Sequence, residues 1–287
     1  MDSDLWQKPL RQLRKQIKRL PDELTPDEIH RLRIHIRRVQ SVLAVIAAPG
    51  SKSARQLIKS IDSLSKICGR VRDLDVAQTN ASVLQAFVPE RSLAKLCRRL
   101  SKQRKRAASK LAELLKRKGN SLRSALKTQT DRMEKKVPAG ERAAVALVPA
   151  NGRPRQLRRL ADSITQKLSA WPEPSGENLH TFRLQVKSLR SLNYYQSAAD
   201  PILDHQLHCV ALEIGSWHDW AYLAALAHEL LNEEKDAELL AHVDGYLKDK
   251  LTDAQEAARS LRVSLQKKKS SHRRSKGASS QKKLHRA

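Results

Sequence analysis

The chain has 287 residues, of which 56 are Lys or Arg and 30 are Asp or Glu, so its formal net charge is +26. Hydrophobic residues make up 40% of it, which allows a core, and no apolar run reaches the roughly 18 residues that a membrane span needs. This composition excludes a transmembrane protein and predicts an acidic partner such as nucleic acid, an anionic membrane surface or inorganic polyphosphate.

Neither the cysteines nor the first residues indicate export from the cell. Cys68, Cys97 and Cys209 are widely spaced and odd in number, so no disulfide framework is expected. The opening MDSDLWQKPLRQLRK has no apolar segment after a basic start, and a secretory signal is therefore not expected. A cytoplasmic location is the prediction.

Helical periodicity runs through the first half of the chain, which is rich in strong helix formers and shows no strand pattern. Thr25 is the expected N-cap of the second helix, with Glu28 three residues later completing a capping box. Gly119 is expected to end a long helix. The predicted helices are 6–20, 26–48, 53–68, 91–118 and 121–136.

The second half has the same character, so the predicted fold class is all-α. Its expected helices are 155–170, 177–198, 203–214, 219–231, 233–247 and 252–265. Residues 138–154 are rich in Pro and Gly and predict a linker between halves at 1–137 and 155–265. Residues 266–287 are strongly basic, with no acidic residue, and predict a disordered tail.

One basic helix pattern occurs twice, at 29–43 (IHRLRIHIRRVQSVL) and at 179–193 (LHTFRLQVKSLRSLN). Positions i, i+3 and i+7 share one face of an α-helix, so each copy presents a row of cations opposite an apolar face. Stripe 1 consists of His30, Arg33 and Arg37, and stripe 2 consists of His180, Arg183 and Lys187. Two like-charged rows repel each other unless an anion binds them, and phosphate is the anion that we expect.

A second motif follows each stripe in the same order. The first copy is Gly69-x-x-Arg72-Asp73, and the second is Gly215-x-x-His218-Asp219. Two motifs that recur in order indicate an internal duplication, which predicts two pseudo-symmetric helical bundles.

Together these motifs resemble the conserved histidine α-helical domain family, CHAD, over most of residues 5–265. The resemblance implies two helical bundles about an approximate two-fold axis, polyphosphate binding in a basic central cavity, and association with polyphosphate granules. Ser188 and Gln40 depart from the pattern, since they stand opposite Arg38 and Arg190 of the other copy. The family's frequent triphosphatase partner domain has no counterpart here, so hydrolysis is not implied.

The predicted site is a non-catalytic polyphosphate site with no metal and no cofactor. Arginine can bind two phosphate oxygens with its forked guanidinium, and a nearby phosphate raises the pKa of histidine, so binding should strengthen towards about pH 6. Asp73 and Asp219 are expected to hold the cations in place, and Gly69 and Gly215 to permit close helix crossing. The predicted binding residues are His30, Arg33, Arg37, Arg38, Arg72, His180, Arg183, Lys187, Arg190 and His218.

Three other readings stay open at this stage. A nucleic-acid-binding or nucleoid-associated protein would use the basic segment 91–136 and the tail, although aromatic stacking residues are few. A phosphate-processing enzyme would need a carboxylate cluster for Mg²⁺, which the sequence does not offer. A metal site at His205, His208 and Cys209 is the third reading, although such a group is more often a helix face near the surface.

Overall fold

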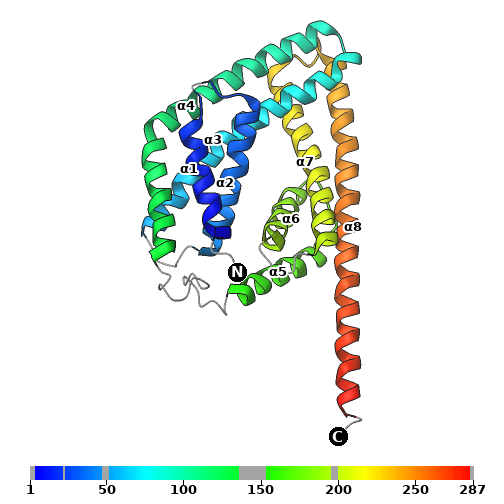
Figure 1. Cartoon of the computed structure of the whole chain (residues 1–287). Coiled ribbons are helices and arrows are strands. Elements are labelled where there is room, and N and C mark those ends of the chain that lie inside the picture. The colour runs from blue at the N-terminus through cyan, green and yellow to red at the C-terminus, as the bar shows by residue number, and fades with distance from the viewer. Residues whose placement is uncertain (1–3, 22, 47–51, 136–152, 195–199, 285–287) are drawn as a thin grey trace. The chain divides into compact units, whose positions relative to one another are not determined.

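The computed structural model describes residues 4–21, 23–46, 52–135, 153–194 and 200–284. Within these residues all regular structure is helical, which confirms the predicted all-α class (Figure 1). The elements are α1 (Asp4–Arg19), α2 (Pro26–Ile46), α3 (Lys52–Val83), the 3-10 turn η1 (Leu84–Ala86), α4 (Glu90–Lys135), α5 (Arg153–Ser169), α6 (Leu179–Tyr194), α7 (Pro201–Leu230) and α8 (Ala237–Leu284).

The chain forms two compact units. Unit 1 comprises Met1–Pro154 and Tyr222–Val243, and unit 2 comprises Arg155–Ala221 and Asp244–Ala287. The end of α7 and the start of α8 thus belong to unit 1, although they come late in the sequence. Residues 138–152 of the predicted linker lie outside the described residues. The last two residues of the predicted linker, 153 and 154, are part of α5.

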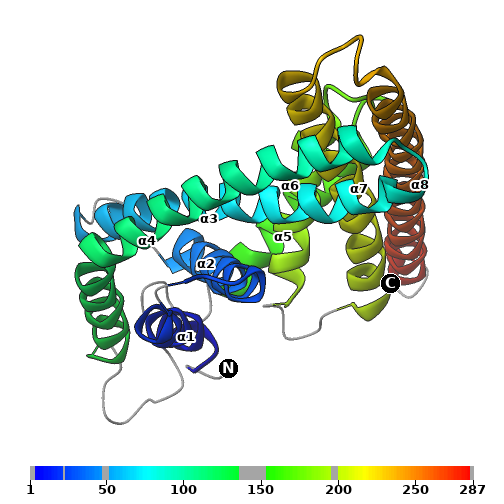
Figure 2. The ribbon, with the colours of Figure 1, turned by 90° about the horizontal axis from the view of Figure 1, so that it is seen from above.

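Unit 1 is built around the long antiparallel pair α3 and α4, which lies over α1 and α2 (Figure 2). The apolar side of α2 packs into this arrangement through Leu32, Ile36 and Val39, whose exposed fraction is 0%. The predicted capping box opens α2: the Thr25 N–H donates to Glu28 Oε2 at 2.9 Å, and the Glu28 N–H donates to Thr25 Oγ1 at 3.3 Å. The cap sets where α2 begins, and the apolar residues of the helix then determine which face packs into the core.

Unit 2 packs around aromatic side chains. Phe182 of α6 is fully buried and meets Trp171 edge-on, with ring centroids 5.4 Å apart. Trp220 of α7 stacks on Tyr246 of α8 at 4.6 Å. The loop before α6 is tied to α8 because Arg262 donates to the Trp171 carbonyl at 3.2 Å. These contacts place α6 with one face towards the core and the other exposed.

Two predicted helix breaks are absent. We expected a break at Gly119 and a separate helix after Gly215, and at Gly69 we left open a continued helix or a sharp turn, but α3, α4 and α7 each run through the glycine without interruption. A glycine inside a helix costs only about 1 kcal/mol relative to alanine, which the packing of a long amphipathic helix outweighs. All three glycines are buried, so each faces a neighbouring element instead of marking a chain end.

The C-terminal segment also differs from the prediction. We expected separate helices at 233–247 and 252–265 followed by a disordered tail, and the structure instead has one helix, α8, from Ala237 to Leu284. The predicted disorder is therefore not confirmed. The segment 266–284 contains no proline and is rich in Lys, Arg, Gln and Ser, so nothing local stops a helix that is already nucleated by unit 2. Among the described residues, no helix is both long enough and apolar enough to cross a bilayer.

Candidate functional site

Stripe 1 lies on the side of α2 that faces away from the core. His30 and Arg37 are exposed, and Arg33 is half-buried, with 23% of its side chain accessible. The neighbouring Arg38 is also exposed. The alternation follows from helix geometry, because the buried apolar residues occupy the opposite face.

Arg33 is the member of stripe 1 that reaches the next helix. Its Nη2 lies 3.9 Å from Oδ1 of Asp73 on α3. Its Nη1 lies only 2.7 Å from the position that a Cβ atom on Gly69 would occupy. Arg72, the residue before Asp73, is half-buried on the same helix. The second motif of unit 1 thus surrounds the stripe arginine.

Stripe 2 has a similar arrangement on α6 and α7. His180 is exposed, and Arg183 and Lys187 are half-buried. Arg183 Nη2 lies 2.9 Å from the position of a Cβ on Gly215, which repeats the relation seen in unit 1. The His180 ring lies 5.4 Å from the ring of His218, centroid to centroid. His218 Nδ1 in turn lies 3.8 Å from Asp219 Oδ1, so the second motif again lies beside the stripe.

The electrostatic environment of His180 is unfavourable for a proton. Partial burial lowers the pKa of His180, and the nearby His218, Arg183 and Lys187 lower this pKa further by repulsion between positive charges. An anion beside these four residues would oppose that repulsion and raise the pKa of the imidazole. Stripe 2 is therefore a cluster of cations whose mutual repulsion a bound phosphate would relieve.

One predicted binding residue, Arg190, and its counterpart in the other repeat have protein partners of their own. Arg190 Nε lies 3.4 Å from Asp204 Oδ1, and Arg190 Nη1 lies 2.8 Å from His208 Nδ1. The matching position in the other repeat is Gln40, whose amide donates to Asp62 Oδ1 at 2.8 Å. Each side chain links its stripe helix to a carboxylate on the following helix.

Arg38 lies close to a residue that the sequence analysis did not single out. Burial, followed by repulsion from Arg38, lowers the pKa of His35. Arg38 thus adds positive potential to a histidine outside the stripe, and stripe 1 has no counterpart of the His180–His218 ring pair among the described contacts.

Further residues near the second motif of unit 1 were not predicted. The Arg70 guanidinium lies 5.3 Å from the ring centroid of Tyr222 and donates to Gln103 at 3.1 Å. Burial is the main cause that raises the pKa of Tyr222, and Asp73 contributes to this rise. Arg70 directly follows Gly69 of the second motif, which is the one sequence signal that points to it. Nothing in the sequence connects Arg70 to Tyr222, because the two residues are far apart in the chain.

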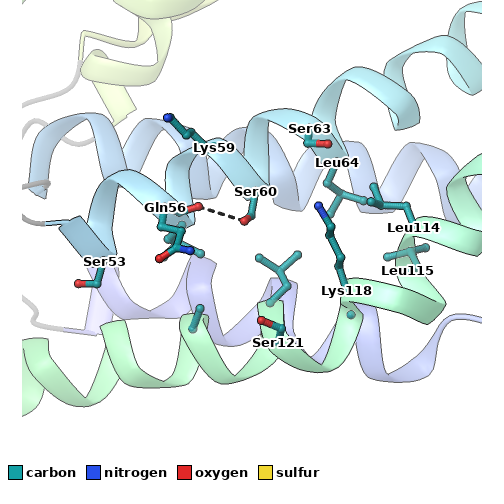
Figure 3. Close-up of a pocket in the computed structure, with 14 residues that line it drawn as sticks. Ser53, Gln56, Lys59, Ser60, Ser63, Leu64, Leu114, Leu115, Lys118 and Ser121 are labelled. Atoms are coloured by element: carbon teal, nitrogen blue, oxygen red, sulfur yellow. Dashed lines mark hydrogen bonds between the residues drawn. The ribbon is translucent and has the colours of Figure 1, made fainter.

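Unit 1 also has a cavity of about 550 Å³ between α3 and α4 (Figure 3). Leucines such as Leu64 and Leu114 line it together with serine hydroxyls and the side chains of Lys59 and Lys118. None of the predicted anion-binding residues lines this cavity. The stripe of unit 1 is a surface feature that is distinct from it.

The structure gives little support to a metal site at His205, His208 and Cys209. Across the part of the chain that the structure describes, no group of three or more His, Cys, Asp or Glu residues could hold a metal ion. Cys209 Sγ is 3.8 Å from the ring nitrogens of His205, which lies one helical turn before it, and His208 is turned to Arg190.

The fold and the site together define an all-α protein with two basic, histidine-containing helix surfaces. The CHAD domain family matches residues 4–228, and the chain belongs to this family. The family is associated with polyphosphate-related proteins.

Two solved structures share the fold. A CHAD domain from the plant Ricinus communis matches with a TM-score of 0.66 and 18% sequence identity, over 91% of this chain and 90% of that chain. PptA from Streptomyces chartreusis matches with a TM-score of 0.64 and 16% identity, over 92% of this chain and 97% of that chain. No curated protein matches the chain.

Proposed function

We propose that this protein is a non-catalytic polyphosphate-binding module that uses stripes 1 and 2 to contact phosphates. The observation that carries the proposal is that a stripe arginine lies against a glycine of the following helix in each unit, next to an exposed histidine and a second cation. Membership of the CHAD family supports the same ligand class. Attachment to polyphosphate granules in the cytoplasm would follow from such binding.

The chemistry of the two stripes suits a polymer that carries charge but has no base to read. Arg33 and Arg183 can each donate two parallel hydrogen bonds to phosphate oxygens, while Lys187 acts as a point charge. Polyphosphate is linear and repeats its charge along its length, so it offers the same phosphate groups to each stripe. Binding that is dominated by such contacts weakens steeply as salt rises.

The test is a salt titration of affinity for polyphosphate, with duplex DNA of equal phosphate concentration beside it. The test variant is Arg33→Ala with Arg183→Ala. The matched control is Arg99→Ala with Arg159→Ala, which removes the same charge from exposed arginines of the same two units outside the stripes. We expect the test variant to lose more than about tenfold in polyphosphate affinity and to show a shallower salt slope. The control should lose no more than about threefold.

Two results would contradict the proposal. Equal losses in the test and control variants would mean that affinity depends on net charge and not on the stripes. DNA that binds as tightly as polyphosphate, and displaces it at equal phosphate, would favour the nucleic-acid-binding alternative.

A further inference from the structure

Gly69 and Gly215 have an unusual neighbour for buried helix glycines. A Cβ atom built on Gly69 would lie 2.7 Å from Arg33 Nη1 and 3.9 Å from Arg33 Cζ. A Cβ atom built on Gly215 would lie 2.9 Å from Arg183 Nη2, and the two next nearest atoms also belong to Arg183. Non-bonded heavy atoms do not approach so closely, so any side chain at either position would displace the guanidinium.

The identity of these neighbours separates two roles for the glycines. A glycine that permits close helix packing faces the backbone or an apolar side chain of the other helix. Gly119 is of this kind, since its nearest neighbour is Ile17 Cγ2 at 3.6 Å. At Gly69, apart from its own helix backbone and chain neighbours, every described atom within 4 Å of the Cβ position belongs to Arg33. The space at Gly69 therefore accommodates a cation and not a helix.

An aspartate completes the arrangement one turn further along the same helix. Gly69 and Asp73 are four residues apart and share a face of α3, as Gly215 and Asp219 share a face of α7. In unit 1 the guanidinium of Arg33 lies against the glycine and 3.9 Å from the carboxylate of Asp73. The glycine leaves room for the planar group, and the carboxylate attracts it. Together they restrict where the long arginine side chain can lie.

We propose that Gly69 and Gly215 are positioning residues for polyphosphate binding, because each leaves the space in which a stripe arginine is held ready for phosphate. This inference rests on the proposed function, since it assumes that Arg33 and Arg183 bind the polymer. Ordering an arginine before the ligand arrives reduces the entropy that binding must overcome. A methyl group at either glycine would push the guanidinium out of this place and leave the side chain to find other positions.

The experiment compares Gly69→Ala with Gly215→Ala, made together, against the control Gly245→Ala. Gly245 lies in α8 with no atom within 4 Å of its Cβ position, so the control changes helix propensity alone. Alanine favours a helix over glycine, so the melting temperature of the double variant should stay level or rise. Its polyphosphate affinity should nevertheless fall by about tenfold or more, while the control binds like the wild type.

A second pair of variants makes the test specific to the guanidinium. Arg33→Lys and Arg183→Lys keep the charge but remove the Nη atoms that lie against the glycines. In this background the two alanine substitutions should have little further effect on affinity, because nothing remains for the methyl groups to displace. A role in helix packing would give the same loss of affinity or folding in both backgrounds.

The outcomes separate the two proposals. If Arg33→Ala with Arg183→Ala leaves affinity unchanged, the proposed function fails. If that variant loses affinity but the alanine variants at the glycines bind like the wild type, the positioning role is overturned. Equal losses in the arginine and lysine backgrounds, or a failure to fold in both, would likewise overturn it.

Discussion

Arg72 and His218 occupy the same position in the two copies of the Gly-x-x-basic-Asp motif, but only the second copy places an imidazole there. In unit 2 this histidine lies beside His180, whose pKa is lowered by burial and then by the neighbouring cations. The two units should therefore respond differently to acid.

We predict that polyphosphate affinity rises as the pH falls from about 8 to about 6. Burial, then the neighbouring cations, lower the pKa of His180 in the protein without ligand, so the ring is largely neutral near pH 7. A bound phosphate raises this pKa, so binding takes up protons and strengthens as the pH falls. Titration calorimetry in buffers with different ionisation enthalpies measures this proton uptake.

The variant His218→Arg supplies the control, because it gives unit 2 the residue that unit 1 already has. We expect it to bind more tightly than the wild type, because arginine places a forked, permanently charged donor beside stripe 2. An unchanged pH dependence in His180→Gln would show that the His180 ring does not take part in binding.

The individual contacts show how far residue-level prediction reached. The position of the stripe cations on one helix face could be predicted from their spacing alone, because the period of an α-helix is a local property. The approach of Arg70 to Tyr222 could not, since it depends on how distant parts of the chain pack. The same holds for the contacts of Arg190 with Asp204 and His208, which spacing within one helix could not reveal.

Among the elements, α4 shows why glycine was a misleading signal. Gly119 was expected to end a helix, and α4 continues through it to Lys135 because its buried leucines on both sides of Gly119 pack as one amphipathic face. By contrast, the capping box at Thr25 was predicted correctly, since its hydrogen bonds involve residues only three apart. Sequence signals whose hydrogen bonds lie within one helical turn can be predicted from the sequence. Whether a glycine ends a helix depends on the residues that pack against it.

We predict that Gly119→Ala stabilises the protein by up to about 1 kcal/mol, or roughly 2–4 °C in melting temperature. An alanine Cβ would lie 3.6 Å from Ile17 Cγ2, an ordinary van der Waals distance, and the residue would gain helix propensity. Thermal unfolding followed by circular dichroism measures the change. A fall in melting temperature would show that α1 and α4 cannot accept the added methyl group.

For the molecule as a whole, Asp236 joins parts of unit 1 that are distant in sequence. Its buried carboxylate accepts hydrogen bonds from Ser92 Oγ at 2.7 Å, from Lys95 Nζ at 2.6 Å and from the Asn232 N–H at 2.9 Å. The hydrogen bond from Lys95 is the largest cause that lowers the pKa of Asp236, and those from Ser92 and Asn232 follow. These bonds attach the start of α4 to the segment between α7 and α8.

We predict that Asp236→Asn lowers the free energy of unfolding by about 2 kcal/mol, because it removes a charged hydrogen-bond acceptor from a buried site. Glu234→Gln, an exposed neighbour in the same segment, is the control and should have little effect. Urea titrations at neutral pH measure the difference.

The same carboxylate should make folding sensitive to acid. Its pKa is lowered in the folded state, so its contribution is present above the ordinary aspartate pKa near 3.8 and is lost as the pH falls below that value. The stability difference between wild type and Asp236→Asn should therefore shrink below about pH 4. A difference that stays constant down to about pH 3 would contradict this linkage.

Sequence alone was sufficient for the helical class, the basic stripes and the family, because helix propensity, periodicity and the charge of a side chain are properties of short segments. Tertiary structure decided which residues meet: Arg33 with Gly69 and Asp73, and Lys95 with Asp236. It also decided where helices end, since α4 continues through Gly119 and α8 continues past the break expected after residue 247. Such contacts join residues far apart in the chain, and only the packed core determines their partners.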